Sequence, residues 1–234
     1  MSKSGDGNFF EDFSLGQKII HATPRTMTEG DRALYTALYG SRFVVQSSDE
    51  FARAVGYPRA PLDDLLVFHI VFGKSVPDIS LNAVANLGYA ECSFSQAVYC
   101  GDTLSSQSEI IGLKENSSAK TGTVYARTTG FNQRGEVVLS YVRSVMVRKR
   151  DEASPAPVAH VPELAKVAAL PTAPKITNWN FEVSGSPHRF DDYAIGEKID
   201  HLDGVTVEEA EHQMATRLYQ NTARVHFNEF AEAQ

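Results

Sequence analysis

The sequence has only two cysteines and no long apolar run. Cys92 and Cys100 form neither a C-x-x-C pair nor a disulfide framework, so we expect two free thiols in a reducing cytoplasm. The longest apolar run, residues 65–72, is interrupted by His69 and is far shorter than the ~18 residues that a membrane span requires. The first residues lack the apolar segment of a signal peptide. These absences argue against a membrane protein and against a disulfide-stabilised secreted one.

An excess of positive charge is also missing. The chain has 22 basic and 29 acidic side chains, a formal net charge of −7, which argues against nucleic acid as a partner. No spacing of histidine and cysteine resembles a zinc site, so we expect no metal. A hydrophobic fraction of 42% over 234 residues is typical of a soluble globular protein with one large domain, or one and a half.

The chain contains an internal repeat. Residues 10–21 (FEDFSLGQKIIH) return as residues 190–201 (FDDYAIGEKIDH), an offset of 180 residues that needs no gap through Gln46 and His226. Twelve of the 37 aligned pairs are identical; in the first copy they are Phe10, Asp12, Gly16, Lys18, Ile19, His21, Thr26, Glu29, Thr36, Leu38, Tyr39 and Val45. A long period that occurs twice predicts two copies of one domain.

The two copies differ in length. The first runs 104 residues beyond Gln46, to Arg150, whereas only 8 residues follow His226. We therefore expect a complete first domain over 8–150, a proline- and alanine-rich connector over 151–187 that lies on the protein surface, and the start of a second domain over 188–234. About 95 residues of the second copy are missing, which predicts a piece of a longer protein or completion by another chain.

The first copy predicts an α+β fold. We expect a short strand at 17–23, a helix that Thr28 caps and Gly40 ends, a short helix at 49–55 and a strongly apolar helix at 62–72. Four strands follow at 85–95, 103–113, 121–131 and 137–149. An antiparallel sheet wrapped round the apolar helix, the hotdog fold, satisfies this order, with Leu65, Phe68, Val71 and Phe72 expected inside the sheet.

Two segments resemble motifs of the MaoC-like hydratase/dehydratase family. Residues 219–231 (YQNTARVHFNEFA) resemble D-x-N-P-x-H-x-D, and residues 97–104 (AVYCGDTL) resemble P-V-x-P-G-D-T-L. Segments 9–13 (FFEDF), 39–46 (YGSRFVVQ), 87–92 (LGYAEC), 109–116 (EIIGLKEN) and 221–228 (NTARVHFN) are more specifically similar to the mesaconyl-CoA hydratase branch, also called β-methylmalyl-CoA dehydratase. The resemblance implies a double hotdog.

The resemblance also implies an activity, the reversible addition of water to a branched C4-dicarboxylic enoyl-CoA in the ethylmalonyl-CoA route. No cofactor is expected besides the CoA of the substrate, and the enzyme is expected to be a cytoplasmic homo-oligomer. By position, the motif histidine falls on His226 and the motif aspartate on Asn221. The first copy has Gln46 and Ser41 there, and because glutamine cannot act as a base, that copy is expected to be non-catalytic.

Asn221 cannot transfer a proton either, so Asp203 or Glu229 is an alternative partner for His226. For the second carboxylate of the substrate, Arg224 and Arg42 are candidate binding residues. Other functions stay open at this point: another MaoC-like enoyl-CoA hydratase, an itaconyl-CoA hydratase, or a non-catalytic hotdog that binds acyl-CoA. Matching histidines His21 and His201 favour a shared structural role, and His69 is expected to be a core residue.

Overall fold

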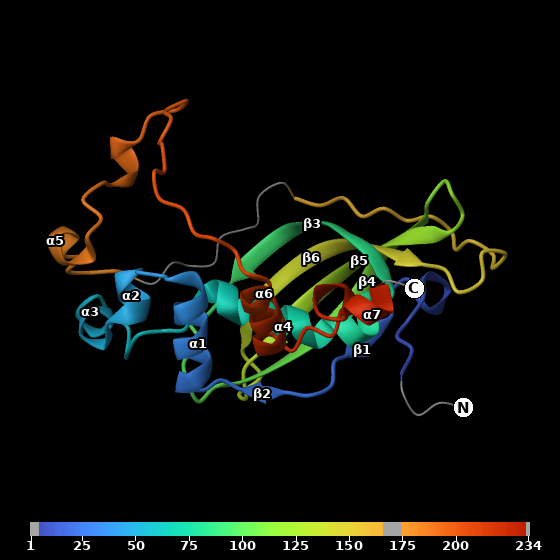
Figure 1. Ribbon diagram of the computed structural model, residues 1–234, viewed down its shortest axis with the longest axis horizontal. Helices are drawn as coiled ribbons and strands as arrows, with labels where there is room; N and C mark the ends of the chain where they lie inside the picture. The colour runs from blue at the N-terminus through green and yellow to red at the C-terminus, as the bar shows by residue number, and fades with distance from the viewer. Residues whose placement is uncertain (1–4, 166–174, 233–234) are drawn as a thin grey trace.

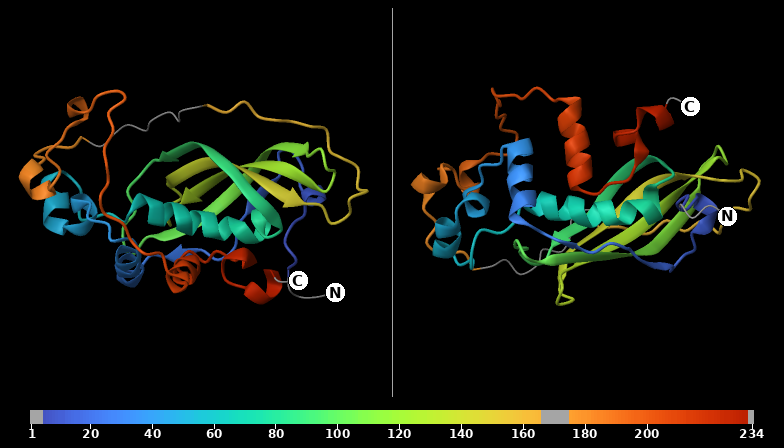
Figure 2. Two further views of the ribbon diagram at one scale, coloured as in Figure 1. Left: turned by 45° about the horizontal axis from the view of Figure 1, so that its top comes forward. Right: turned by 60° about the horizontal axis from the view of Figure 1, so that its bottom comes forward.

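In the computed structural model, residues 5–165 and 175–232 are described. Residues 166–174 of the expected connector and the last two residues of the second copy therefore lie outside the described residues. A curved antiparallel sheet holds a long helix, α4, in its concave face (Figures 1 and 2). The strands are β1 Lys18–Ile20, β2 Arg25–Thr26, β3 Ala83–Phe94, β4 Thr103–Glu115, β5 Thr121–Phe131 and β6 Val137–Arg148.

The sheet order is β1-β4-β5-β6-β3, and β2 pairs with β4. Every pairing is antiparallel. The four long strands lie within two residues of the ranges that the sequence predicts, because alternating apolar residues and intervening turn residues mark them clearly. The expected antiparallel sheet around one helix, the hotdog fold, is confirmed. Tyr141 and Val145 of β6 are fully buried, and this face of the strand packs on α4.

The helices are α1 Glu29–Tyr39, α2 Val44–Ser47, α3 Asp49–Ala54, α4 Asp64–Ser75, α5 Phe181–Ser184, α6 Glu209–Leu218 and α7 Glu229–Glu232. The predicted boundaries of α1 are confirmed. The Thr28 hydroxyl accepts a hydrogen bond from the Asp31 amide at 3.2 Å, and the Asp31 carboxylate accepts one from the Thr28 amide at 2.8 Å. Gly40 ends the helix with φ 62°, a left-handed conformation that favours glycine.

The apolar helix differs from the prediction in two respects. It starts at Asp64 rather than Leu62, because the Asp63 carboxylate caps it by accepting a hydrogen bond from the Leu65 amide at 2.8 Å. Leu65 is 57% exposed, so its predicted place inside the sheet is wrong; it lies in the first turn, before the helix enters the core. Val71 is buried as predicted, while Phe68 and Phe72 are half-buried. Although its apolar residues occur on nearly every face, helix α4 is therefore not buried on all sides.

The segment after β6 follows the surface of the sheet. His160 and Leu113 exchange backbone hydrogen bonds of 2.8 and 2.9 Å, and the Ala165 amide donates to Glu91 at 2.9 Å. Beyond the undescribed residues, the Trp179 ring packs edge-on against Phe51 with ring centroids 5.1 Å apart. The expectation of a connector that lies on the protein is confirmed for these residues. Cys92 and Cys100 are free thiols, as expected.

Local geometry repeats at the 180-residue offset. Short 3₁₀ turns form at Phe10–Asp12 and Phe190–Asp192, and each is closed by its aspartate, Asp12 on the Phe9 amide and Asp192 on the Arg189 amide. The helices α1 and α6 also correspond. The surroundings differ, because His21 is buried between Asp78 and Ser108 with hydrogen bonds of 2.7 Å to each, whereas His201 is exposed. The structural role expected of both histidines is therefore found only for His21.

Candidate active site

Helix α6 lies beside α1, and its C-terminal end reaches α4 (Figure 2). Tyr219, directly after α6, donates a 2.6 Å hydrogen bond from its hydroxyl to that of Tyr39, directly at the end of α1. These two tyrosines are 180 residues apart and correspond in the repeat. A contact between equivalent residues is what a two-fold arrangement of α1 and α6 would produce.

Three contacts hold the end of α6 against the first copy. The Tyr219 ring stacks on His69 of α4, with centroids 4.3 Å apart and planes 16° apart. The carbonyl of Leu218 accepts a hydrogen bond from the Arg25 guanidinium. The backbone of Tyr219 passes directly over Gly73 of α4, where a Cβ atom would overlap its carbonyl group. The segment that follows, which carries the motif residues, is thereby placed on α4.

Asn221 forms the turn that leaves α6. Its side-chain oxygen accepts a 2.9 Å hydrogen bond from the Ala223 backbone amide, and the backbone amide of Asn221 donates to the Thr216 carbonyl at 3.1 Å. The oxygen is therefore engaged by the backbone, which leaves the side-chain NH₂ as the group that can meet a ligand. His226 follows in a 3₁₀ turn, Arg224–His226.

His226 pairs with a second histidine. Its Nδ1 lies 3.2 Å from Nε2 of His212 on α6, so one ring nitrogen donates and the other accepts. Burial, and secondarily the neighbouring His212, lower the pKa of His226 below its ordinary value of 6.5. The imidazole of His226 is therefore neutral near pH 7 and able to accept a proton.

Both motif residues line one pocket of about 570 Å³ between the two copies. Its walls are the end of α1, the middle of α4, the start of β3, and α6 with its flanking segments; the lining residues are Leu38, Tyr39, His69, Phe72, Asn86, Tyr89, Val205, Thr206, Val207, Glu211, His212, Ala215, Thr216, Tyr219, Asn221 and His226. A volume of this size accommodates the acyl part of a thioester. The structure thus brings His226 and Asn221 to one cavity.

The other predicted site residues lie elsewhere. Arg42 and Arg224 are exposed and neither lines the pocket. The alternative carboxylates Asp203 and Glu229 are exposed and do not line it either, whereas Glu211 does.

Sequence reasoning missed several pocket residues. His69 was expected in the core, but it is half-buried on the pocket wall, where burial lowers its pKa. His212 was not a candidate, and Tyr39 was noted only as an identity of the repeat and as part of segment 39–46. The identity of Tyr39 and Tyr219 across the repeat was the one available signal, because equivalent residues on a pseudo-two-fold axis can meet.

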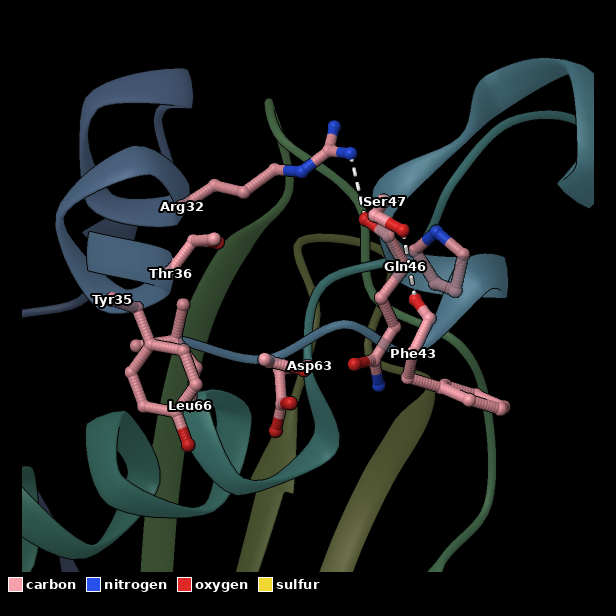
Figure 3. Close-up of a pocket in the computed structure, with 10 residues that line it drawn as sticks. Arg32, Tyr35, Thr36, Phe43, Gln46, Ser47, Asp63 and Leu66 are labelled. Atoms are coloured by element: carbon pink, nitrogen blue, oxygen red, sulfur yellow. Dashed lines mark hydrogen bonds between the residues drawn. The ribbon is translucent and has the colours of Figure 1, made fainter. Parts of the chain in front are cut away.

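The equivalent position in the first copy is nearly closed (Figure 3). The pocket there measures about 20 Å³, close to the volume of one water position. It includes Ser41 and Gln46, the counterparts of Asn221 and His226. Arg32, the counterpart of His212, donates a 2.7 Å hydrogen bond to the Gln46 backbone carbonyl. A pocket this small has no room for an acyl thioester, and Gln46 places an amide where the second copy has an imidazole.

Among the described residues, no three histidine, cysteine, aspartate or glutamate side chains are grouped to hold a metal ion. No helix of residues 5–165 or 175–232 has the length and apolar character needed to cross a membrane.

The fold and the paired motif residues place the chain among the MaoC-like dehydratases of the hotdog class. A crystal structure of a MaoC domain dehydratase from Chloroflexus aurantiacus superposes with a TM-score of 0.96 at 60% identity, covering 99% of this chain and 68% of that one. A Mycobacterium tuberculosis protein described as a double hotdog matches with a TM-score of 0.74 over 97% of this chain and 71% of its own; at 23% identity this likeness concerns the fold alone.

Sequence comparison identifies the family. Residues 2–168 match the family described as mesaconyl-CoA hydratase. The chain is 60% identical to the β-methylmalyl-CoA dehydratase of Chloroflexus aurantiacus, over 100% of this chain and 68% of that protein. It is 61% identical to the mesaconyl-CoA hydratase of Cereibacter sphaeroides, over 97% of this chain and 67% of that protein. The chain belongs to the mesaconyl-CoA hydratase family.

Proposed function

We propose that this protein reversibly adds water to the double bond of mesaconyl-CoA to give β-methylmalyl-CoA. The observation that carries the proposal is the pocket between the copies, which both Asn221 and His226, with its lowered pKa, line. The 60% identity to relatives named for this reaction supports the choice of substrate.

The chemistry follows from these groups. Water is a weak nucleophile, so a neutral His226 takes its proton while the oxygen bonds to the β-carbon. The double-bond electrons move toward the thioester oxygen. The imidazolium of His226, which now carries the proton taken from water, then donates a proton to the α-carbon. The NH₂ group of Asn221 donates a hydrogen bond to the water or to the thioester oxygen, because its side-chain oxygen already accepts from Ala223. In the reverse direction the same groups expel water.

The reaction requires no redox step, so the proposal includes no cofactor besides the CoA of the substrate. We further propose that the protein is a homo-oligomer and that it lies in the cytoplasm. The free thiols of Cys92 and Cys100 are compatible with that compartment. Within metabolism, the step belongs to the ethylmalonyl-CoA route.

The test compares His226→Ala with Gln46→Ala, its counterpart in the first copy. Hydration is followed as the loss of enoyl-thioester absorbance. We expect His226→Ala to lower kcat by about 10²–10⁴-fold, the usual contribution of a positioned base, and Gln46→Ala to change it far less. Equal losses in the two variants would contradict the assignment of the chemistry to the second copy.

A further inference from the structure

A buried arginine without a counter-ion lies behind the wall of the pocket. Arg143 on β6 is 0% exposed. Its Nη2 donates a 3.1 Å hydrogen bond to the Ser75 hydroxyl, whereas its Nε and Nη1 have no hydrogen-bond partner among the described residues. Within the same residues no carboxylate forms an ion pair with it. Burial of an unpaired guanidinium is unfavourable, and such a group calls for a specific explanation.

Two aromatic side chains separate this guanidinium from the pocket. The Phe72 ring lies directly against it, with Cζ of Arg143 4.6 Å from the ring centroid. Tyr89 on β3 is the cross-strand partner of Arg143 in the antiparallel pair, so the two side chains lie on the same face of the sheet. Phe72 and Tyr89 both line the pocket that contains His226. Arg143 is therefore one side chain away from the site.

The pocket itself lacks a permanent cation. Among the described residues, its lining contains no lysine and no arginine, and Glu211 adds negative charge. The substrate of the proposed function carries a free carboxylate besides its thioester. A carboxylate that leaves water requires a paired cation, and a guanidinium is the side chain best suited to hold it through two N–H groups. Arg42 and Arg224 are exposed and do not line this pocket.

We propose that Arg143 binds the free carboxylate of the enoyl-CoA substrate when the half-buried Phe72 ring turns aside. This inference rests on the proposed function and names its specificity-determining residue. The unpaired N–H groups of Arg143 then gain the acceptor that they lack, and the carboxylate fixes the double bond relative to His226. A substrate without the carboxylate leaves the guanidinium unpaired, which disfavours its binding.

The experiment compares two substrates in variants of the whole protein. One substrate is mesaconyl-CoA, and the other is the analogue in which a methyl group replaces the free carboxylate. We expect Arg143→Met to lower kcat/KM for mesaconyl-CoA by about 10²–10³-fold while it changes the value for the analogue only slightly or raises it. Arg148→Met, an exposed position on the same strand, is the matched control and should leave both values unchanged.

A second variant covers the case in which Arg143→Met does not fold. Arg143→Lys keeps the charge but loses the planar pair of donors, so it should lose about 10-fold toward mesaconyl-CoA and keep its rate with the analogue. Inhibition by the saturated 2-methylsuccinyl-CoA should weaken in parallel. An equal loss toward both substrates, or an unchanged preference in the lysine variant, would overturn the role of Arg143. Failure of the wild-type protein to hydrate mesaconyl-CoA would instead overturn the proposed function itself.

Discussion

Gly73 of α4 allows the backbone of Tyr219, in the second copy, to pack directly against the first copy. The variant Gly73→Ala tests whether the site depends on this close contact. A Cβ atom here would lie 3.0 Å from the Tyr219 carbonyl carbon and closer still to its oxygen, whereas ordinary contacts begin near 3.4 Å. Because the carbonyl oxygen is the nearer atom, the backbone of Tyr219 must retreat by about 1 Å or more. Asn221 and His226 follow Tyr219 along the chain, so the retreat displaces the proposed catalytic groups.

Two opposing effects set the stability change. Alanine in a helix interior is favoured over glycine by about 1 kcal/mol. Overpacking of a close contact costs about 1–3 kcal/mol, so we expect a net loss of stability of about 0–2 kcal/mol. The effect on the reaction should be larger, because a misplacement of about 1 Å lowers a rate by up to about 10²-fold. A large loss of kcat with a small loss of stability is therefore the expected pattern.

The assay combines urea unfolding with the rate of mesaconyl-CoA hydration. Gly30→Ala is the matched control, since it also lies in a helix but its Cβ atom would meet only the Thr28 hydroxyl oxygen at an ordinary 3.5 Å. This variant should be slightly more stable than the wild type and equally active. An active and stabilised Gly73→Ala protein would refute the close approach of Tyr219 to α4.

Three further predictions concern the same elements. The acid limb of kcat/KM should have its midpoint below pH 6.5, because burial and His212 lower the pKa of His226 and the base must be neutral; a pH profile with a midpoint above 7 contradicts this. Tyr219→Phe should lower the free energy of unfolding by about 0.5–1.5 kcal/mol, and a double-mutant cycle with Tyr39→Phe should show coupling; strictly additive losses contradict the hydroxyl pair. Thr28→Ala should destabilise the protein by about 1 kcal/mol in urea unfolding through loss of the α1 cap, and an unchanged midpoint speaks against that cap.

Part of the candidate site was predictable from the sequence. The motif resemblance located His226 and Asn221, and both line the pocket. Arg42 and Arg224 were predicted to pair with the second carboxylate because of their charge, but both are exposed outside the pocket. Their direction depends on how the turns after α1 and α6 pack, which no local pattern records.

The fold of the first copy depends mainly on local information. Alternation along the strands, turn residues between them, the Thr28 cap and the Gly40 stop all act over a few residues, so the sequence by itself determined these elements and their order. The 180-residue repeat is also a property of the sequence alone, because it needs only identities at a constant offset.

Only the tertiary structure decided which residues meet. The pairing of Tyr39 with Tyr219 joins segments that are far apart in the chain. The same is true of the histidines that line the pocket, and the burial of Arg143 also depends on distant segments. Leu65 and Arg143 illustrate the reason: hydrophobicity predicts a buried leucine and an exposed arginine, whereas packing leaves the leucine in the open first turn of α4 and encloses the arginine between sheet and helix. Burial is a property of what surrounds a side chain, and that is known only when the whole fold is assembled.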